Sequence, residues 1–121
     1  MVVLVRACKY WTDTGLDVDA SAVYEFRCEG RWLDWCVTTD AKGYDAVWFG
    51  QRMLNRSLRL KTAPWFALCG EVRGDGRGPF FIGSTTRLQI PAGRLMCFAN
   101  DVRGFYWNNR GELTLTIRRV E

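Results

Sequence analysis

One stretch of the sequence, residues 100–111, gathers oxygen-bearing side chains of the kind that bind hard metal ions. Asp101, Asn108 and Asn109 offer carboxylate and amide oxygens there, and the whole sequence contains no histidine. Ca²⁺ prefers such ligands and takes roughly 6 to 8 of them at about 2.3–2.6 Å. The stretch therefore predicts a calcium site whose remaining positions are open to backbone carbonyls, water or ligand hydroxyl groups.

The same stretch can also be interpreted as an Asn- and Gly-rich turn whose amides bond to their own backbone. From the loop alone, the turn and the metal site are equally good interpretations. Adjacent residues of a strand point to opposite faces, so Asn108 and Asn109 can share one centre only where the backbone is irregular. We therefore expect residues 100–111 to be a loop between strands over residues 94–99 and 112–120.

Strands must position this loop, because helix signals are weak throughout the sequence. Short runs rich in Val, Thr, Phe, Tyr, Trp and Leu recur between Gly and Asp residues. About eight or nine such runs, spaced roughly 8–12 residues apart, predict an all-β, jelly-roll-like sandwich of short antiparallel strands in two sheets. The pattern fades over residues 38–64, where we expect no regular structure beyond one helical turn near Met53 and Leu54.

Glycine and proline residues mark the expected boundaries of several strands. Residues 12–15 (TDTG) are predicted to be a turn before a strand that starts at Leu16. Residues 31–37 are expected to run from a strand into the long connection, and residues 65–69 to be a buried strand after Pro64. The glycine-rich residues 70–78 lack the Gly-Lys-Ser/Thr ending of a phosphate-binding loop and are followed by a strand pattern, which predicts a hairpin turn.

Length and charge limit the class of protein. The 121 residues suit a single domain over residues 1–121, and no apolar run approaches the ~20 residues of a membrane span. Lys and Arg number 17 against 13 Asp and Glu, and the net charge of +4 is scattered, so we expect neither nucleic-acid binding nor membrane insertion. The first residues do not have the pattern of a signal peptide, which predicts a cytoplasmic protein or one released without a cleavable signal peptide.

The cysteines and the missing histidine exclude further kinds of site. Five cysteines without CxxC spacing, in a chain without histidine, argue against zinc. Cys97 lies in an apolar run, where a free Cys packs as a small hydrophobic residue. We expect five reduced and mostly buried thiols, with a Cys8–Cys28 disulfide as the open alternative. Ser–His and Cys–His nucleophiles cannot form, and the chain is predicted not to be an enzyme.

Three phrases of the sequence resemble one known family. They are residues 11–18 (WTDTGLDV), residues 66–83, and residues 100–109 (NDVRGFYWNN). Together they resemble the LecA-type galactophilic bacterial lectins and the wider set of galactose-binding-like β-sandwich domains. The pattern Asn-Asp-Val-x-Gly-x-Tyr-x-Asn-Asn is specific in both type and spacing. The resemblance implies a jelly-roll sandwich with one Ca²⁺, coordinated jointly by the protein and by two adjacent sugar hydroxyls.

The resemblance also implies which residues bind. The calcium would be held by side-chain oxygens of Asp101, Asn108 and Asn109 and by the backbone carbonyls of Phe105 and Trp35. The sugar would be contacted by Asp101, Asn108, Val102, Trp107 and Gln51. Trp107 stands where a glycine is common in the lectins and would wall the site, with Tyr44 and Trp48 of the long connection as further candidates for that wall. Gln51 would replace a glutamine that holds the sugar.

The chain departs from the lectin pattern at the mouth of this site. The galactophilic lectins also use a histidine, which is missing here, and Phe105 and Arg103 replace a threonine and a proline. We therefore expect a galactose-like or other vicinal-diol sugar with altered specificity. The alternative is a non-catalytic interaction or structural domain in which the metal only orders the loop. A homo-oligomer is also considered, because linked weak sites gain roughly 10²–10⁴ in avidity.

Overall fold

The computed structural model describes every residue from 1 to 121, and strands dominate it. In chain order the strands are β1 (Val2–Arg6), β2 (Thr12–Val18), β3 (Tyr24–Glu29), β4 (Trp32–Asp34), β5 (Val37–Thr39), β6 (Leu68–Arg73), β7 (Phe80–Phe81), β8 (Thr85–Leu88), β9 (Gly93–Ala99) and β10 (Asn109–Arg119). The helical segments are α1 (Phe49–Met53) and the 3-10 turns η1 (Asn55–Ser57) and η2 (Tyr106–Asn108). None of them has the length and apolar character that a membrane-spanning helix needs.

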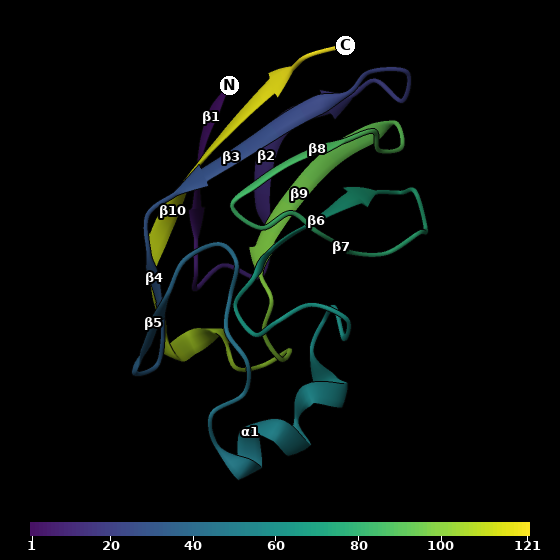
Figure 1. The fold of residues 1–121 in the computed structure, drawn as a ribbon. Helices are drawn as coiled ribbons and strands as arrows, with labels where there is room; N and C mark the ends of the chain where they lie inside the picture. The colour runs from purple at the N-terminus through teal and green to yellow at the C-terminus, as the bar shows by residue number, and fades with distance from the viewer.

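The strands form two antiparallel sheets that pack as a sandwich (Figure 1). The larger sheet has six strands in the order β5-β4-β10-β3-β8, with β1 also paired to β10, and the smaller has the order β2-β9-β6-β7. The predicted all-β sandwich is confirmed. The strand that the sequence did not separate is β5, which forms a hairpin with β4 through Trp35 and Cys36. This turn contains no Gly, Asn or Asp, so the usual turn signal is missing.

The core fills the space between the two sheets as one cluster of 20 buried residues. Alternate residues of β10, Leu113, Leu115 and Ile117, face this core, and the residues between them are exposed. Burying each such side chain contributes about 1.5–3 kcal/mol. Because β10 pairs with β1, β3 and β4, these residues fix the strand at whose start Asn109 lies.

The predicted turn over residues 12–15 is wrong, because these residues belong to β2. Gly15 has a φ of +79°, and the register with β9 shifts between Asp13 and Asp17. Such a shift is a β-bulge, and a bulge that needs a positive φ uses the same Gly and Asp residues as a turn. The sequence therefore marked the correct residues but not the type of irregularity.

The prediction for the glycine-rich segment also needs correction. The buried strand expected over residues 65–69 is β6, which begins at Leu68 and continues through Gly70 to Arg73, so the connection to β7 starts only after Arg73. A Cβ added to Gly70 would lie 3.0 Å from side-chain carbons of both Phe80 and Ile82. Gly70 is small because the sheet packs closely there, and not because the chain turns.

The five cysteines are all free. Cys28, Cys69 and Cys97 are buried, as most cysteines were expected to be, whereas Cys8 and Cys36 are exposed in turns. The alternative Cys8–Cys28 disulfide is not formed. The buried thiols act as small hydrophobic residues of the core.

Candidate functional site

Three connections meet at one end of the sandwich, near α1 (Figure 1). They are the β4–β5 turn, the long connection from β5 to β6, and the loop from β9 to β10. Between them lies a pocket of about 190 Å³, lined by Asp34, Trp35, Trp48, Gln51, Leu54, Trp65, Asp101, Phe105 and Asn108. Five of the residues predicted from the sequence therefore line one pocket: Trp35, Gln51, Asp101, Phe105 and Asn108.

Asp101 is a buried carboxylate with no cation beside it. Asp101 is 1% exposed, and it takes part in none of the salt bridges of the molecule. Oδ1 accepts from the Val102 N–H at 2.7 Å, and Oδ2 accepts from Nδ2 of Asn109 at 2.9 Å. Burial raises the pKa of Asp101 to about 7 against the effect of these two hydrogen bonds. The site therefore lacks the positive charge that a buried carboxylate needs.

Two amide oxygens beside Asp101 are also incompletely bonded. Oδ1 of Asn108 and Oδ1 of Asn109 are the buried side-chain polar atoms of the molecule without any hydrogen-bond partner. Nδ2 of Asn109 donates to Oδ2 of Asp101 and, at 3.1 Å, to the carbonyl of Ala7, which fixes the orientation of that amide. A buried oxygen without a partner costs about 1–3 kcal/mol. Together with the Asp101 carboxylate, these oxygens fit a hard divalent cation such as Ca²⁺.

The predicted loop ends earlier than expected. Asn108 closes η2 and Asn109 opens β10, so residues 109–111 belong to a strand that pairs with β4. The boundary between the two elements lies between the two asparagines. The sequence predicted an irregular loop at both asparagines. In the structure the irregularity is instead the boundary between η2, which carries Asn108, and β10, which carries Asn109.

Trp35 occupies an unusual backbone conformation at the edge of the pocket. Its φ is +55°, in the left-handed region that non-glycine residues rarely adopt. Such a conformation costs of the order of 1–3 kcal/mol and persists where the surroundings hold it in place. Here the β4–β5 hairpin holds it, with Asp34 paired to Val37. The residue predicted to offer a backbone carbonyl therefore lies in a constrained turn that lines the pocket.

Gln51 is held at the pocket by bonds at both ends of its amide. Oε1 accepts from the Val47 N–H at 2.8 Å, and Nε2 donates to the Tyr44 hydroxyl at 2.7 Å. That hydroxyl in turn donates to Oδ2 of Asp34, whose pKa is raised by burial. An amide nitrogen carries two hydrogens, so one Nε2 hydrogen remains for a ligand.

Asn100 ties the long connection to the loop that carries Asp101. Its buried amide donates to the carbonyls of Leu60, Ala63 and Pro64, and its Oδ1 accepts from the Leu60 N–H. The Arg59 N–H donates to the Asp101 carbonyl at 3.2 Å, next to these bonds. The sequence pattern gave no sign of this link, because the residues that Asn100 holds are 36 to 40 positions away.

Comparison with solved structures finds the same sandwich in a known domain. The N-terminal domain of EclA, described as a PllA-like lectin, matches with a TM-score of 0.75 over 98% of this chain and 95% of that chain. The fold is that of a PllA-like lectin domain. The two sequences are 20% identical, so the likeness establishes the fold alone. No family model matches the sequence, and no curated protein matches it.

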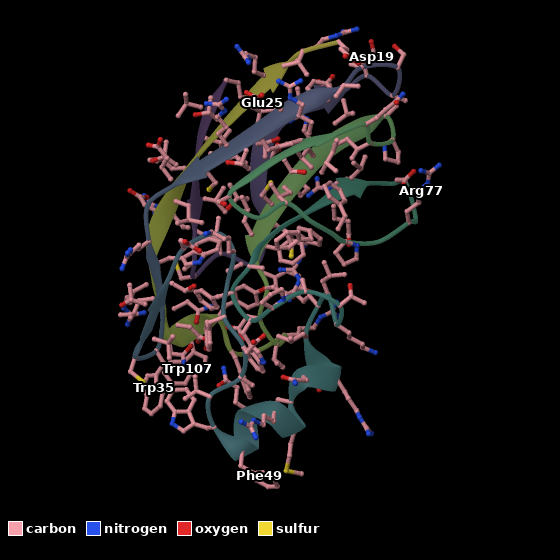
Figure 2. The ribbon with its side chains drawn as sticks, in the orientation of Figure 1. Asp19, Glu25, Trp35, Phe49, Arg77 and Trp107 are labelled. Atoms are coloured by element: carbon pink, nitrogen blue, oxygen red, sulfur yellow. The ribbon has the colours of Figure 1, made fainter.

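The two remaining residues predicted to contact sugar lie outside this pocket. Trp107 is 75% exposed and does not line it, although it lies at the same end of the molecule as Trp35 and Phe49 (Figure 2). Val102 is buried, 8% exposed, and forms a bridge with Leu58. Neither side chain is among those that surround the pocket.

Four further residues complete the pocket lining, Asp34, Trp48, Leu54 and Trp65, and Trp48 is the exposed one among them. It is 42% exposed and stands directly before α1, and its ring lies 5.7 Å from that of Trp35, centroid to centroid. The two indoles form an aromatic wall at the mouth of the pocket. The signal available in the sequence was the apolar run Val47, Trp48 and Phe49 within a polar connection, and all three residues are exposed.

Proposed function

We propose that this chain is a calcium-dependent carbohydrate-binding domain that takes a sugar by two vicinal hydroxyl groups, with galactose-like sugars as the expected class. The observation that carries the proposal is the buried, unpaired Asp101 carboxylate beside two partnerless amide oxygens, those of Asn108 and Asn109. A bound Ca²⁺ would supply positive charge and coordination positions for two sugar oxygens in place of water.

The residues around the ion would each have a defined part. Asp101, Asn108 and Asn109 would hold Ca²⁺ through side-chain oxygens, and the backbone carbonyls of Phe105 and Trp35 would complete the protein ligands. Asp101 is the single carboxylate among these ligands, and Asp34, which also lines the pocket, accepts from the Tyr44 hydroxyl instead. The open positions of Ca²⁺ suit hydroxyl and water oxygens. No proton transfer or bond cleavage is needed for this function, and we propose no catalytic role.

The pocket walls support a sugar as the ligand. Sugar rings present C–H faces that pack on aromatic rings, and Trp35, Trp48 and Phe105 offer such rings beside the proposed ion. The free Nε2 hydrogen of Gln51 can donate to a further hydroxyl. A volume of about 190 Å³ is below the roughly 300–1,000 Å³ of sites for drug-sized ligands, which suits one sugar ring.

Specificity should differ from that of the galactophilic lectins that the sequence resembles. Those lectins use a histidine on the sugar, and this chain has none. Losing one hydrogen bond costs about 0.5–1.5 kcal/mol, or roughly two- to tenfold in affinity. Affinity for simple galactosides should fall by that factor unless the indole of Trp48 or the amide of Gln51 compensates.

Isothermal titration tests the proposal in two stages. Ca²⁺ is titrated into chelator-treated protein, and methyl galactoside, methyl mannoside and methyl fucoside are then titrated into the calcium-loaded and the EDTA-treated protein. We expect one calcium per chain and sugar binding only with calcium. Asp101→Asn should abolish both, while the control Asp75→Asn, which removes a carboxylate far from the pocket, should change neither. Sugar binding that persists in EDTA would overturn the mechanism, and calcium binding without any sugar binding would favour the structural alternative.

A further inference from the structure

A second and larger pocket, of about 490 Å³, adjoins the first. Trp65 lines both pockets, so the two are neighbours. The second pocket lies in the long connection between β5 and β6, along α1 and η1, and contains none of the proposed calcium ligands. Its chemistry therefore has to be explained separately.

Two cationic side chains, Arg52 and Lys61, line this second pocket and are not neutralised. Neither takes part in any of the salt bridges of the molecule, which involve other residues. Asp45 is the single carboxylate in the lining, and it also forms no ion pair. Two positive charges and one negative charge leave a formal charge of +1 on a concave surface. Both cationic residues are exposed, so their charges are accessible to a ligand in this pocket.

Two residues of the second pocket, Tyr44 and Trp65, are paired through their backbones. Tyr44 and Trp65 exchange both backbone hydrogen bonds, at 2.8 and 2.9 Å. Nε1 of Trp65 donates to Oδ1 of Asn55 at 2.7 Å, which orients the Asn55 amide. The two Nδ2 hydrogens of Asn55 have no partner within the chain, so they are available to a ligand in the second pocket.

We propose that the second pocket is a subsite for an acidic group, a sulfate or a carboxylate, on the saccharide residue next to the one that binds through its diol. This inference rests on the proposed function and names the class of glycan: a short acidic oligosaccharide that contacts both pockets. Arg52 offers a fork of N–H donors, Lys61 a compact charge, and Asn55 two neutral donors, which together match the acceptors of an oxyanion. Trp65, which lines both pockets, lies between the two subsites.

Matched neutral and sulfated disaccharides test the subsite. The probes are N-acetyllactosamine and its form sulfated at O6 of N-acetylglucosamine, the residue next to galactose, titrated into calcium-loaded protein at low ionic strength. Contacts with two partly solvated cations should make the sulfated form bind roughly three- to tenfold more tightly than the neutral sugar. The advantage should shrink as salt is added, because exposed charges are screened.

Three variants assign the effect to the pocket. The double variant Arg52→Gln/Lys61→Gln should bind neutral and sulfated forms equally, with unchanged affinity for the neutral one. Asp45→Asn should increase the preference for sulfate. Arg56→Gln is the matched control, because Arg56 is exposed in η1, next in sequence to Asn55, but does not line the pocket. If Arg56→Gln removes the preference as fully as the double variant does, the effect is one of general charge and the subsite is refuted.

The outcomes separate this inference from the proposed function. Equal binding of the sulfated and neutral forms by the wild type would overturn the acidic subsite and leave the diol site standing. Failure of the wild type to bind either form in saturating Ca²⁺ would overturn the proposed function itself. Circular dichroism of each variant confirms that a lost preference is not a loss of folding.

Discussion

The side-chain amide of Asn109 donates to the buried carboxylate of Asp101 at 2.9 Å and leaves its own oxygen buried without a partner. The hydrogen bond is an ordinary structural contact. The buried amide oxygen without a partner is unusual. Buried polar groups are almost always paired in folded proteins, so each exception needs an explanation, and a bound ion is the one that we propose here. The side-chain oxygen of the neighbouring residue, Asn108, is also buried without a partner.

The two asparagines should respond differently to substitution. Asn108→Ala removes an unpartnered oxygen and no side-chain hydrogen bond. It should therefore change the free energy of unfolding without metal by less than about 0.5 kcal/mol. Asn109→Ala removes the donor to Asp101 and to Ala7, and should lower the free energy of unfolding by about 1–3 kcal/mol. Urea denaturation in EDTA measures both.

The calcium effect, in contrast, should be lost in both variants. Both variants should lose the rise in melting temperature that Ca²⁺ gives the wild type, because ligand binding to the folded state stabilises it by mass action. Differential scanning fluorimetry with and without Ca²⁺ measures this rise. If Asn108→Ala keeps the full calcium effect, its oxygen is not a ligand.

Asn100 should be a large contributor to stability even though it contacts no predicted ligand. Its buried side chain makes one bond to the Leu60 N–H and three to carbonyls of the long connection. Asn100→Ala should lower the free energy of unfolding by about 3 kcal/mol or more, since several buried groups lose their partner at once. Asn108→Ala, which removes no side-chain hydrogen bond, serves as the comparison in urea denaturation and should cost much less. A loss below about 1 kcal/mol for Asn100→Ala would show that the connection is held by other contacts.

Part of this site could be predicted from the sequence because the ligand chemistry is local. Asp101, Asn108 and Asn109 lie within nine residues, and their oxygens indicate a hard cation without knowledge of the fold. The resemblance to lectins then added Phe105, Trp35 and Gln51, all of which line the pocket. Alternating hydrophobic residues in β10 and its neighbours likewise predicted the sandwich.

The rest depends on contacts that sequence patterns do not encode. Trp48 joins the pocket only because the connection after Tyr44 folds back onto the β4–β5 hairpin, where Tyr44 bonds to Asp34. That connection has no hydrophobic periodicity, so nothing local indicates which of its aromatic residues faces the site. The β-bulge in β2 was missed for a related reason, since Gly15 with a positive φ serves a turn and a bulge equally well.

The cysteines should divide into two classes by reactivity. Cys8 and Cys36 are exposed, whereas Cys28, Cys69 and Cys97 are buried. Burial raises the pKa of Cys28 and of Cys69 to about 12, so their thiolate fraction at neutral pH is very small. Titration with Ellman's reagent should find two fast thiols in the native protein and five after denaturation without reductant. Fewer than five in the denatured protein would reveal a disulfide.

Glu25 should make stability depend on acid. It lies on β3 among Arg27, Arg87 and Arg118, with ion pairs of 3.0 to 3.1 Å. Desolvation raises its pKa, but the hydrogen bond from Arg87 and the charges of the arginines outweigh this and lower the pKa below its ordinary value. A carboxylate with a lowered folded-state pKa stabilises the protein fully above its unfolded value of about 4.3, and this stabilisation disappears as pH falls towards the folded value.

Glu25→Gln tests this linkage. The variant should melt below the wild type at pH 7, and the difference should shrink as pH falls below about 4. Glu29→Gln removes an exposed carboxylate of the same strand without an ion pair and is the matched control. A difference that is constant from pH 7 to pH 3 would mean that Glu25 acts through packing and not through its charge.

The aromatic wall should contribute more to sugar binding at Trp48 than at Trp107. Trp48 lines the pocket beside Trp35, while Trp107 is 75% exposed and lies outside the lining. Stacking of an aromatic ring is worth about 0.5–1.5 kcal/mol, so Trp48→Ala should weaken binding of a methyl galactoside by roughly two- to tenfold. Trp107→Ala should change it by less than about twofold, because a side chain that does not line the pocket has no ring face against the sugar. Calorimetric titration of both variants in saturating Ca²⁺ measures the contrast, with calcium affinity as the control that the ion site is intact. A larger loss from Trp107→Ala would return the wall of the site to the residue that the sequence favoured, and would require the η2 turn to carry Trp107 over the pocket when sugar binds.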